Sequence, residues 1–370
     1  MTKKLFKRSK IIFSSSVLIV ITHSQMCLAW GDLGHQTVAE IAQRNLSPKA
    51  KIMVSEILGH GPLAEAAIFP DLVRSDEDFK EFSSFHFIEI DPRWGTYQKI
   101  PFYLKEKRDA NSLISNIPTK LFENILSKPK FNKNQRQDLL RYLVHLVGDV
   151  HQPLHVGNGF DRGGNWCQIK YPISKNKNSF KKEDEVLFNK SNLHSFWDST
   201  LVENIFYFQK TKNPNYKIPS WKGYVELADL ILSESKPAEQ KSFQTLDIYT
   251  WYAESQELHT KVYPDKNKTT LASERSYCQR LVKDEKGEIV KDDFGVAKII
   301  KDTDVAELDD SYMLNSAEII KQQILKAGLR LAAVMNDMAQ KNYQDPTESF
   351  EESKLNDLKM LLNEFNNSTK

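Results

Sequence analysis

The sequence predicts a mostly α-helical fold, and three observations support this expectation. Apolar residues recur at helical spacing in several stretches along the chain. The two clearest stretches, residues 134–152 and 314–340, are each long enough for several helical turns. Only two short segments, residues 85–90 and 166–171, alternate between apolar and polar residues as a strand does.

The first half of the chain contains three expected helices. Residues 30–58 form two of them, because Ser47 and Pro48 break one periodic run and begin the next. The apolar positions of these two helices are Val38, Ile41, Ala42, Ile52, Val54, Ile57 and Leu58. The third helix covers residues 134–152 and ends at Pro153. Its buried face is expected to carry Leu139, Leu140, Leu143, Leu146 and Val147.

The second half is expected to be helical with long polar interruptions. Residues 191–206 and 243–263 are compatible with helices, and residues 314–340 carry a broad apolar stripe. That stripe consists of Ile319, Ile320, Ile324, Leu325, Leu331 and Val334. Two Lys-rich stretches, residues 172–190 and 265–310, read as insertions or long loops. After Pro346, Leu355, Leu358, Leu362 and Phe365 share one stripe, which predicts a short C-terminal helix.

The first 29 residues resemble a secretory signal that is removed on export. Five basic residues precede an apolar run that is too short to span a bilayer, and small residues follow it before Trp30. No other segment approaches the length of a membrane span. We therefore expect three parts: a cleaved signal at 1–29, a domain at 30–341, and a C-terminal extension at 342–370.

Removal of the signal changes the charge and the cysteine count. Without its five basic residues, 46 of the 51 Lys and Arg remain against 49 Asp and Glu, so the net charge becomes −3. A chain with this balance has no overall field that attracts a polyanion. Cys27 is lost with the signal, which leaves Cys167 and Cys278. In an oxidising compartment these two are expected to form a disulfide, although two free buried thiols remain the alternative.

Histidine and aspartate gather in one short stretch. Residues 145–166 hold three of the nine histidines of the chain and two aspartates. His145 and Asp149 lie four apart on an expected helix, so both project from one face, and His194 and Asp198 repeat this spacing. One such pair alone more often consists of a buried core histidine and an acidic side chain that hydrogen-bonds to it. Two pairs together with His155 indicate a catalytic zinc site, since no cysteine cluster accompanies them.

Further motifs upstream extend this set of candidate ligands. His35, Asp71 and His86 lie in the segments WGDLGH, FPDLVR and HFIEI. If the signal is cut after Ala29, the new amino group of Trp30 is a further nitrogen ligand. His151 points away from the ligand face of its helix and is expected to have a structural role. Exposed tryptophans could stack on bases, but large aromatic residues mostly fill cores.

Taken together, these motifs resemble the zinc-dependent single-strand-specific nucleases of the S-one/P-one type. The resemblance extends from WGDLGH through HLVGDVHQPLH, DRGGN and LHSFWD to KAGLRLAAVMN, which is nearly all of the chain after residue 29. It implies a single, mostly α-helical domain of the phospholipase C and nuclease type, with three zinc ions at the bottom of a cleft. It also implies a protein that acts as a monomer without a membrane anchor.

The resemblance implies which residues bind the three zinc ions. One zinc is held by Asp71, His86, His145 and Asp149, a second by His155, His194 and Asp198, and a third by Trp30, His35 and Asp149. Three divalent ions against three ligand carboxylates leave about +3 at the site, which attracts a phosphate despite the acidic surface.

The resemblance also implies the chemistry and the substrate contacts. The expected reaction is hydrolysis of single-stranded DNA and RNA to 5′-mononucleotides, with action on 3′-nucleotides as well. Asp71, Arg74 and Glu89 are the expected catalytic side chains, and Phe87, Asp161 and Asn165 the expected substrate contacts. Glu89 departs from the family, which often has Asp at this position, and this leaves the general base open.

Two other functions compete with this interpretation. A zinc-dependent phospholipase C shares the fold and the ligand chemistry, but His194 is paired here with Asp198 and not with Glu. An exported zinc-binding protein without catalysis would need neither Arg74 nor Asn165. Assays on nucleic acid and lipid substrates separate the three.

Overall fold

The computed structural model describes residues 30–77, 79, 85–89, 133–157, 161–173, 187–264, 279–291, 299–301 and 305–341. The expected signal at 1–29 and the expected C-terminal helix at 349–365 lie outside these residues. Within them the fold is mostly helical, as the sequence predicts.

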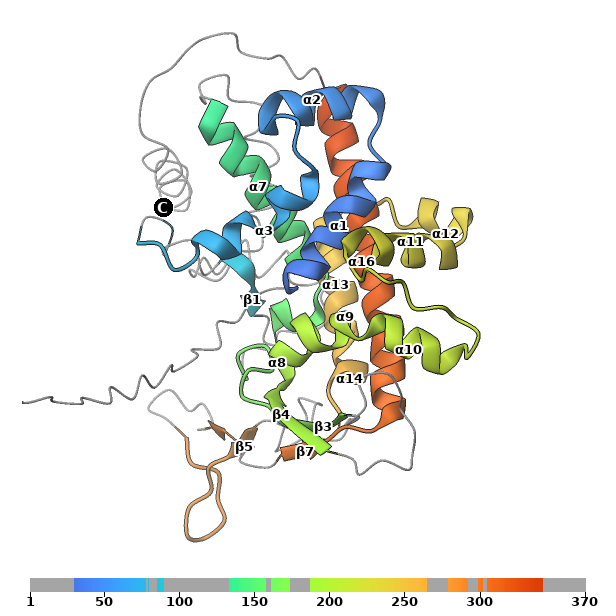
Figure 1. Ribbon diagram of the computed structural model, residues 1–370. Helices are drawn as coiled ribbons and strands as arrows, with labels where there is room; N and C mark the ends of the chain where they lie inside the picture. Colours follow the sequence, from blue (N-terminus) through green and yellow to red (C-terminus); the bar gives the residue numbers. More distant parts are fainter. Residues whose placement is uncertain are drawn as a thin grey trace, which may run out of the picture.

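The helices account for most of the described residues (Figure 1). They are α1 (Asp32–Arg44), α2 (Pro48–Leu58), α3 (Leu63–Val73), α7 (Lys133–Asp149), α8 (Leu193–Ser195), α9 (Leu201–Glu203), α10 (Ile205–Lys212), α11 (Tyr224–Glu234), α12 (Pro237–Ser242), α13 (Ile248–Glu257), α14 (His259–Val262) and α16 (Asp310–Gln340). A short 3-10 turn, η4 (Pro153–His155), and a π turn, η5 (Phe196–Thr200), complete the set.

Helices α2 and α16 begin with side-chain caps that the sequence provides. Ser47 accepts a hydrogen bond from the backbone N–H of Ala50 at 3.2 Å, and Pro48 occupies the first position of α2. Asp309 caps α16 in the same way by accepting from the N–H of Tyr312 at 2.7 Å. Helix α2 therefore begins where the sequence predicts it, whereas α16 begins four residues before the expected start at residue 314.

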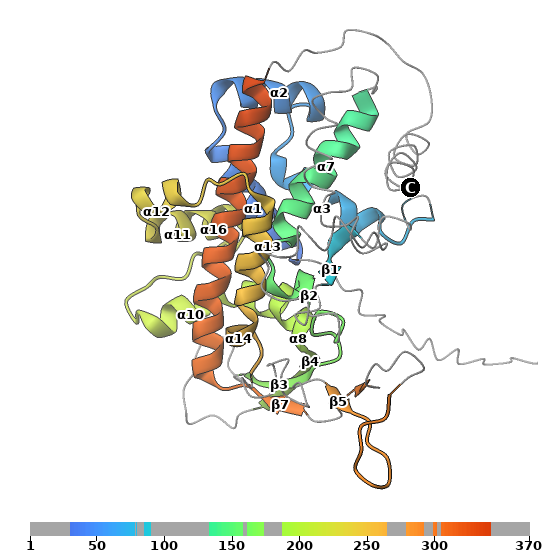
Figure 2. The same cartoon turned by 180° about the vertical axis from the view of Figure 1, so that it is seen from behind.

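Helix α16 runs the height of the described fold, and the other long helices pack around it (Figures 1 and 2). It contacts α1, α2 and α7, while α1 also packs on α3 and α11, and α3 packs on α7. The apolar core lies between these helices and includes the fully buried Trp30, Trp197, Phe196, Phe206 and Ile41. Consequently the N-terminal helix and the helix near residue 340 form one packed unit.

The strands are short, and those of the largest sheet lie at the lower end of the fold in Figure 1. They are β1 (Ile88–Glu89), β2 (Val156–Gly157), β3 (Gln168–Ile173), β4 (Leu187–Asn192), β5 (Gln279–Leu281), β6 (Ile299–Lys301) and β7 (Val305–Glu307). The largest sheet has the order β4-β3-β7, with β3 antiparallel to β4 and parallel to β7. Strand β1 pairs in parallel with β2, and β5 pairs in the antiparallel direction with β6.

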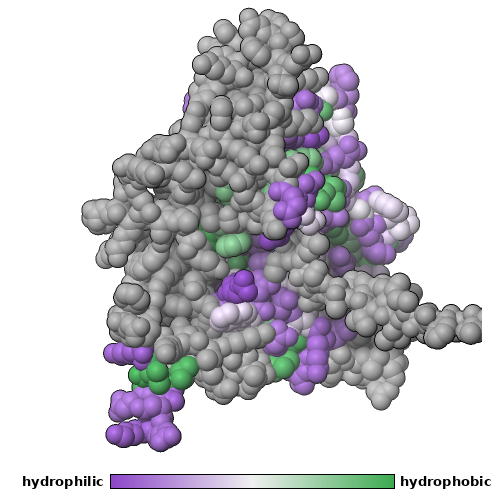
Figure 3. All heavy atoms as spheres, turned by 90° about the vertical axis from the view of Figure 1, so that its left-hand side faces the viewer, coloured by the Kyte–Doolittle hydropathy of each residue, from purple (hydrophilic) through white to green (hydrophobic). Residues whose placement is uncertain are grey.

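The two polar stretches expected as loops contain strands, so this expectation was wrong in part. Strand β4 ends the first stretch, and β5, β6 and β7 lie in the second. Each strand has only a few residues, and β7 is largely exposed, so the sequence has no buried face that would reveal it. The turn at 283–289 is mostly exposed and forms a hydrophilic protrusion at the bottom of Figure 3.

The expected helix at 191–206 is also less regular than predicted. It consists of α8, the π turn η5 and α9 in succession, and α10 follows after Asn204. A π turn inserts an extra residue into the helical repeat, and such turns are frequent at functional sites. Asp198 lies within this turn.

Among the described residues, no single helix is long and apolar enough to cross a membrane, although α2 and α3, bent by 42°, pass together on length and composition.

Candidate metal centre

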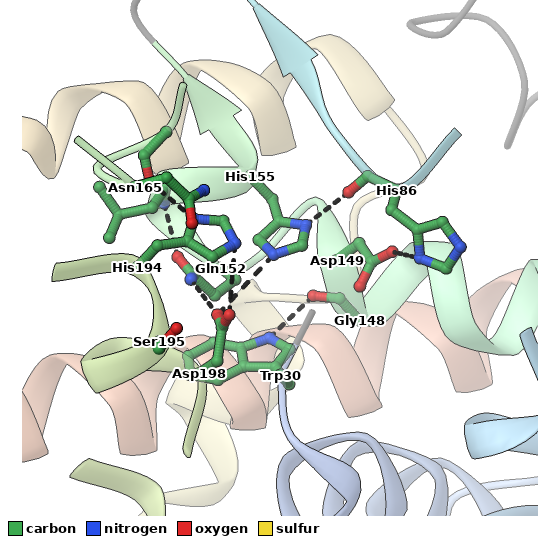
Figure 4. Close-up of polar contacts among 12 residues, drawn as sticks. Trp30, His86, Gly148, Asp149, Gln152, His155, Asn165, His194, Ser195 and Asp198 are labelled. Atoms are coloured by element: carbon green, nitrogen blue, oxygen red, sulfur yellow. Dashed lines mark hydrogen bonds and ion pairs between the residues drawn. The ribbon is translucent and has the colours of Figure 1, made fainter. Parts of the chain in front are cut away.

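Three groups of histidine and aspartate side chains lie close together in the interior. They are His35, His145 and Asp149; Asp71, His86 and His145; and His155, His194 and Asp198. Within each group the potential ligand atoms lie within 4.8 Å of one another. The three groups contain eight of the nine residues predicted as ligands. In Figure 4, His155, His194 and Asp198 face one another, and a carboxylate oxygen of Asp149 faces the ring of His86.

Asp149 connects the first two groups because its two carboxylate oxygens face different histidines. Its Oδ1 lies 3.2 Å from Nε2 of His35. Its Oδ2 lies 3.2 Å from Nδ1 of His86 and 3.3 Å from Nε2 of His145. Asp71 closes the second group, with Oδ1 3.6 Å from His86 and 3.7 Å from His145. A carboxylate in this arrangement can bridge two cations.

The third group is built on the irregular helix at 193–200. Nε2 of His194 lies 3.2 Å from Oδ2 of Asp198, and Nε2 of His155 lies 3.7 Å from Oδ1. The two imidazole rings stack, with centroids 4.8 Å apart. His155 reaches this group because β2, which begins at the next residue, pairs in parallel with β1 and so places His155 beside His86.

Backbone carbonyls fix the orientation of three of these rings. Nδ1 of His145 is 2.7 Å from the carbonyl of Ala67, Nδ1 of His155 is 2.5 Å from that of His86, and Nδ1 of His194 is 2.6 Å from that of Gly163. With the Nδ1 proton donated to a carbonyl, each ring presents Nε2 to the centre. Metal-binding histidines in proteins have this arrangement.

Trp30 and Gly31, at the start of the described chain, form two hydrogen bonds next to the metal centre. The indole Nε1 of Trp30 donates to the carbonyl of Gly148 at 2.9 Å, and the N–H of Gly31 donates to the carbonyl of Asp198 at 2.8 Å. Trp30 is fully buried. Gly148 also leaves space for His35, since an added Cβ would lie 2.7 Å from its Nδ1. The backbone of Trp30 therefore lies between the first and third groups.

Buried polar atoms without hydrogen bonds make these groups fit a metal. In the described part of the chain, both ring nitrogens of His35, both carboxylate oxygens of Asp149, Oδ1 of Asp71, Nε2 of His155 and Oδ2 of Asp198 are buried and form no hydrogen bond. Leaving such an atom unsatisfied costs about 1–3 kcal/mol. Five such residues in one region are better explained by cations that use these atoms as ligands, and imidazole and carboxylate ligands suit zinc.

Burial and mutual charge set the protonation of the centre. Burial lowers the pKa of His194, and it lowers that of His86 to about 4. Burial also lowers the pKa of His145, but the charges of Asp149 and Asp71 outweigh it and raise the value to about 9. For Asp149, burial raises the pKa, but His145 and the other facing histidines hold it well below its usual value. Asp149 is thus an ionised carboxylate, as a ligand must be.

The predicted catalytic and substrate residues lie around these groups. Arg74 caps the C-terminus of α3, and its charge adds to the effect of burial in lowering the pKa of His194. Phe87 follows His86 and is 37% exposed. Asn165 is half-buried near His194 (Figure 4) and donates to the carbonyl of Arg162 at 2.7 Å. Of Glu89 only the backbone in β1 is described.

Asp161 has a different environment from the other predicted substrate contacts. It is fully buried, and its Oδ1 accepts from the N–H of Gly164 at 2.9 Å. Arg162, Gly163 and Gly164 all have positive φ, of 57°, 59° and 80°. The carboxylate therefore stabilises a tight turn whose Gly163 carbonyl holds His194.

Sequence analysis did not single out Gln152, which also contacts the centre. Its Nε2 donates to Oδ1 of Asp198 at 2.5 Å, and its Oε1 accepts from the N–H of Leu154 at 2.5 Å. The sequence signal was its place between His151 and Pro153 in the ligand-rich stretch. His151 lies outside the three groups, with Nδ1 2.7 Å from the carbonyl of Val147.

Comparison with known proteins identifies similar sequences. A sequence model of the S1/P1 Nuclease family matches residues 30–303. Endonuclease 4 of Arabidopsis thaliana is 22% identical over 330 residues, which are 86% of this chain and 92% of the relative. Nuclease S1 of Aspergillus oryzae is 31% identical over 184 residues, 49% of this chain and 57% of the relative. Nuclease P1 of Penicillium citrinum is 29% identical over 179 residues, 48% of this chain and 59% of the relative.

Proposed function

The chain belongs to the S1/P1 nuclease family and is a nuclease, and on this premise we propose that it is an exported enzyme with three zinc ions. Its proposed reaction is the endonucleolytic hydrolysis of single-stranded DNA and RNA to 5′-mononucleotides. Action on 3′-nucleotides is part of the same proposal. The observation that carries it is Asp149, whose two oxygens face His35 on one side and His86 and His145 on the other.

The proposed ligands are the eight clustered side chains together with the amino and carbonyl groups of Trp30. Bound zinc would supply positive charge for the phosphate and would lower the pKa of the attacking water. Asp71 and Glu89 are the carboxylates proposed to orient that water and accept its proton. For Asp71, a position facing His86 and His145 supports this role.

Substrate recognition is proposed to rest on Arg74, Phe87 and Asn165. The guanidinium of Arg74, near His194, would donate to phosphate oxygens as negative charge develops. The exposed ring of Phe87 would stack on a base, which requires that the base first be unstacked and so favours single strands. Asn165 would hydrogen-bond a base edge. Asp161 would act by holding the turn that carries Asn165, since its carboxylate is buried.

The test measures chelator-sensitive hydrolysis by the mature protein. Substrates are single-stranded DNA, the same DNA as a duplex, RNA, 3′-AMP and a phosphatidylcholine emulsion, each with and without chelator. The expected result is release of 5′-nucleotides from the single strands and of phosphate from 3′-AMP, with the lipid untouched. Hydrolysis of the lipid alone would support a phospholipase C instead. Zinc binding without any hydrolysis would support a non-catalytic zinc-binding protein.

The zinc ligands are tested by metal content. His145→Ala and Asp149→Ala are each expected to lose zinc and activity together, because His145 faces Asp71 and Asp149 and because Asp149 faces three histidines. Retention of both zinc and nuclease activity in these variants would refute the ligand assignment.

Processing and covalent structure complete the proposal. Export would remove residues 1–29 and leave a monomeric nuclease domain at 30–341 with an extension at 342–370. The packing of α1 against α16 supports this domain boundary. Cys167 and Cys278 are proposed to form a disulfide, of which Cys278 lies outside the described residues. N-terminal sequencing, size-exclusion chromatography and non-reducing peptide mapping test these three points.

A further inference from the structure

A polar network, buried except for the half-buried Glu254, lies next to the three ligand groups but belongs to none of them. It consists of His151 after α7, Glu254 on α13, and Gln323 and Arg330 on α16. His151 is fully buried, Arg330 is 1% exposed and Gln323 is 2% exposed. The proposed reaction gives none of these side chains a task, although burying them has a cost in free energy.

The contacts of Arg330 use its whole guanidinium. Nη1 donates to Nε2 of His151 at 2.9 Å, Nε donates to the carbonyl of Phe243 at 3.0 Å, and Nη2 lies 2.9 Å from both oxygens of Glu254. Because Arg330 donates to Nε2, the proton of His151 resides on Nδ1, which donates to the carbonyl of Val147. The imidazole is therefore a neutral link between α16 and the end of α7.

The backbone after α7 is held by two further side chains. Val150 and His151, the two residues after α7, are buried, and buried backbone carbonyls need hydrogen-bond partners. Nε2 of Gln323 donates to the carbonyl of His151 at 2.8 Å, and the hydroxyl of Ser255 donates to that of Val150 at 2.6 Å. These contacts fix the two residues between Asp149 and Gln152.

The fixed segment has metal-centre residues on both sides. Asp149, which faces three histidines, precedes it directly. Gln152, which holds Asp198, follows it directly, and His155 comes three residues later. A shift of residues 150 and 151 would therefore move Asp149 of the first group, which also faces two histidines of the second, and His155 of the third.

Helix α16 also contacts the segment that carries His194 and Asp198. The indole Nε1 of Trp197, the residue before Asp198, donates to the hydroxyl of Tyr312 at 2.9 Å. That hydroxyl in turn donates to the carbonyl of Val262. One helix thus contacts residues adjacent to the ligands at 149 and at 198.

We propose that α16, which lies beyond the residues matched by the family model, sets the zinc affinity of the centre, with Gln323 and Arg330 as positioning residues that act through His151. The proposal rests on the ligand assignment made under the proposed function. Partners that orient metal ligands typically contribute 10- to 100-fold to metal affinity, and this is the size of effect we expect.

The test measures zinc affinity by chelator competition in the mature protein. Gln323→Leu removes the donor to the His151 carbonyl with little change in volume, and Arg330→Met removes the guanidinium but keeps an aliphatic chain. Each variant is expected to bind zinc about 10- to 100-fold more weakly. The matched control is Lys326→Met, since Lys326 lies on α16 with Gln323 and Arg330. This variant breaks the 2.9 Å ion pair of Lys326 with Glu254 on α13 and removes no contact of His151. It is expected to keep wild-type zinc affinity.

A double-mutant cycle separates positioning from general stability. If Arg330 acts through His151, Arg330→Met should cause no further loss of zinc affinity in a His151→Phe background. Unfolding of the metal-free proteins is measured in parallel. Unchanged zinc affinity in Gln323→Leu, with or without a loss of stability, would overturn the proposal. If Arg330→Met does not fold, the result for Gln323→Leu alone decides the proposal. Asp149→Ala is the reference: if it too retained zinc, the ligand assignment would fail instead.

Discussion

At the scale of single residues, Gly163 shows how one backbone position serves the centre. Its φ of 59° lies in the left-handed region, and its carbonyl holds Nδ1 of His194 at 2.6 Å. An added Cβ would also collide with the carbonyl oxygen of Leu154. The position therefore requires glycine both for its conformation and for space.

We predict that Gly163→Ala destabilises the protein by about 3 kcal/mol, from backbone strain and the collision together. It should also reduce zinc content, because the carbonyl that orients His194 must move. Gly59→Ala is the control: its φ of 86° brings strain, but nothing lies within 4 Å of the added Cβ. Denaturant unfolding and metal analysis of both variants check this prediction, and equal effects in the two would contradict it.

Phe87 leads to a prediction about substrate binding and not about stability. Its ring is 37% exposed, so Phe87→Ala should change the free energy of unfolding little. Loss of one base stack costs about 1–3 kcal/mol, which corresponds to a KM for single-stranded DNA about 5- to 150-fold higher. Zinc content should not change. Trp221→Ala, which removes an aromatic side chain that is 73% exposed, is the control and should leave KM unchanged. An unchanged KM in Phe87→Ala would refute the stacking role.

The candidate ligands could be predicted from the sequence because His and Asp four residues apart must share a helix face. The supporting residues could not be predicted in the same way. Gln152, Gln323 and Arg330 are held by backbone carbonyls and buried partners whose positions only the fold determines. One signal was present, since Gln323 and Arg330 lie seven residues apart on the apolar side of the expected helix.

At the scale of elements, the long helices were predictable, and so were two strands, since β1 lies within residues 85–90 and β3 overlaps residues 166–171, whereas β2, β4, β5, β6 and β7 were not predicted. α7 and α16 follow the apolar periodicity, because a helix that packs on a core must present one continuous stripe. β1 and β2 have only two residues each, so their pairing depends on how the neighbouring helices position the two segments. The π turn at Phe196–Thr200 was also missed, since its sequence has the composition of an ordinary helix.

The pairing of α13 with α16 makes stability depend on pH. Burial raises the pKa of Glu254, but Arg330 and Lys326 outweigh it, so the pKa is lowered below 4.5 in the folded protein. A carboxyl group with a lowered pKa stabilises the fold above its unfolded pKa, and this contribution is lost as the pH falls through the folded value.

We therefore predict that Glu254→Gln costs about 2 kcal/mol at neutral pH, because it leaves the buried Arg330 without its counter-ion. The difference from wild type should shrink as the pH falls from the ordinary value of 4.5 through the lowered pKa of Glu254, because the wild-type carboxylate then becomes protonated. Unfolding of the metal-free proteins between pH 3 and 7 measures it. A difference that is independent of pH would show that the ion pair does not carry the effect.

At the scale of the whole molecule, the proposed export and the metal centre are coupled through Trp30. Its side chain is anchored to Gly148, and the next N–H is anchored to Asp198, so the backbone lies at the centre whatever precedes it. An amide nitrogen has no lone pair for a metal, whereas a deprotonated α-amino group has one. Cleavage before Trp30 would therefore create a ligand that the precursor lacks.

This coupling predicts that one additional residue at the N-terminus removes one zinc. A chain that begins at Trp30 should bind three zinc ions, and a chain that begins at Ala29 should bind two, with its nuclease activity reduced. The fold should be equally stable without metal, because both anchors of the Trp30 segment are kept. An extra residue after Lys370 is the matched control and should leave the zinc content unchanged. Three zinc ions in the Ala29 chain would show that His35 and Asp149 hold the third ion without the amino group, and that the centre is complete before processing.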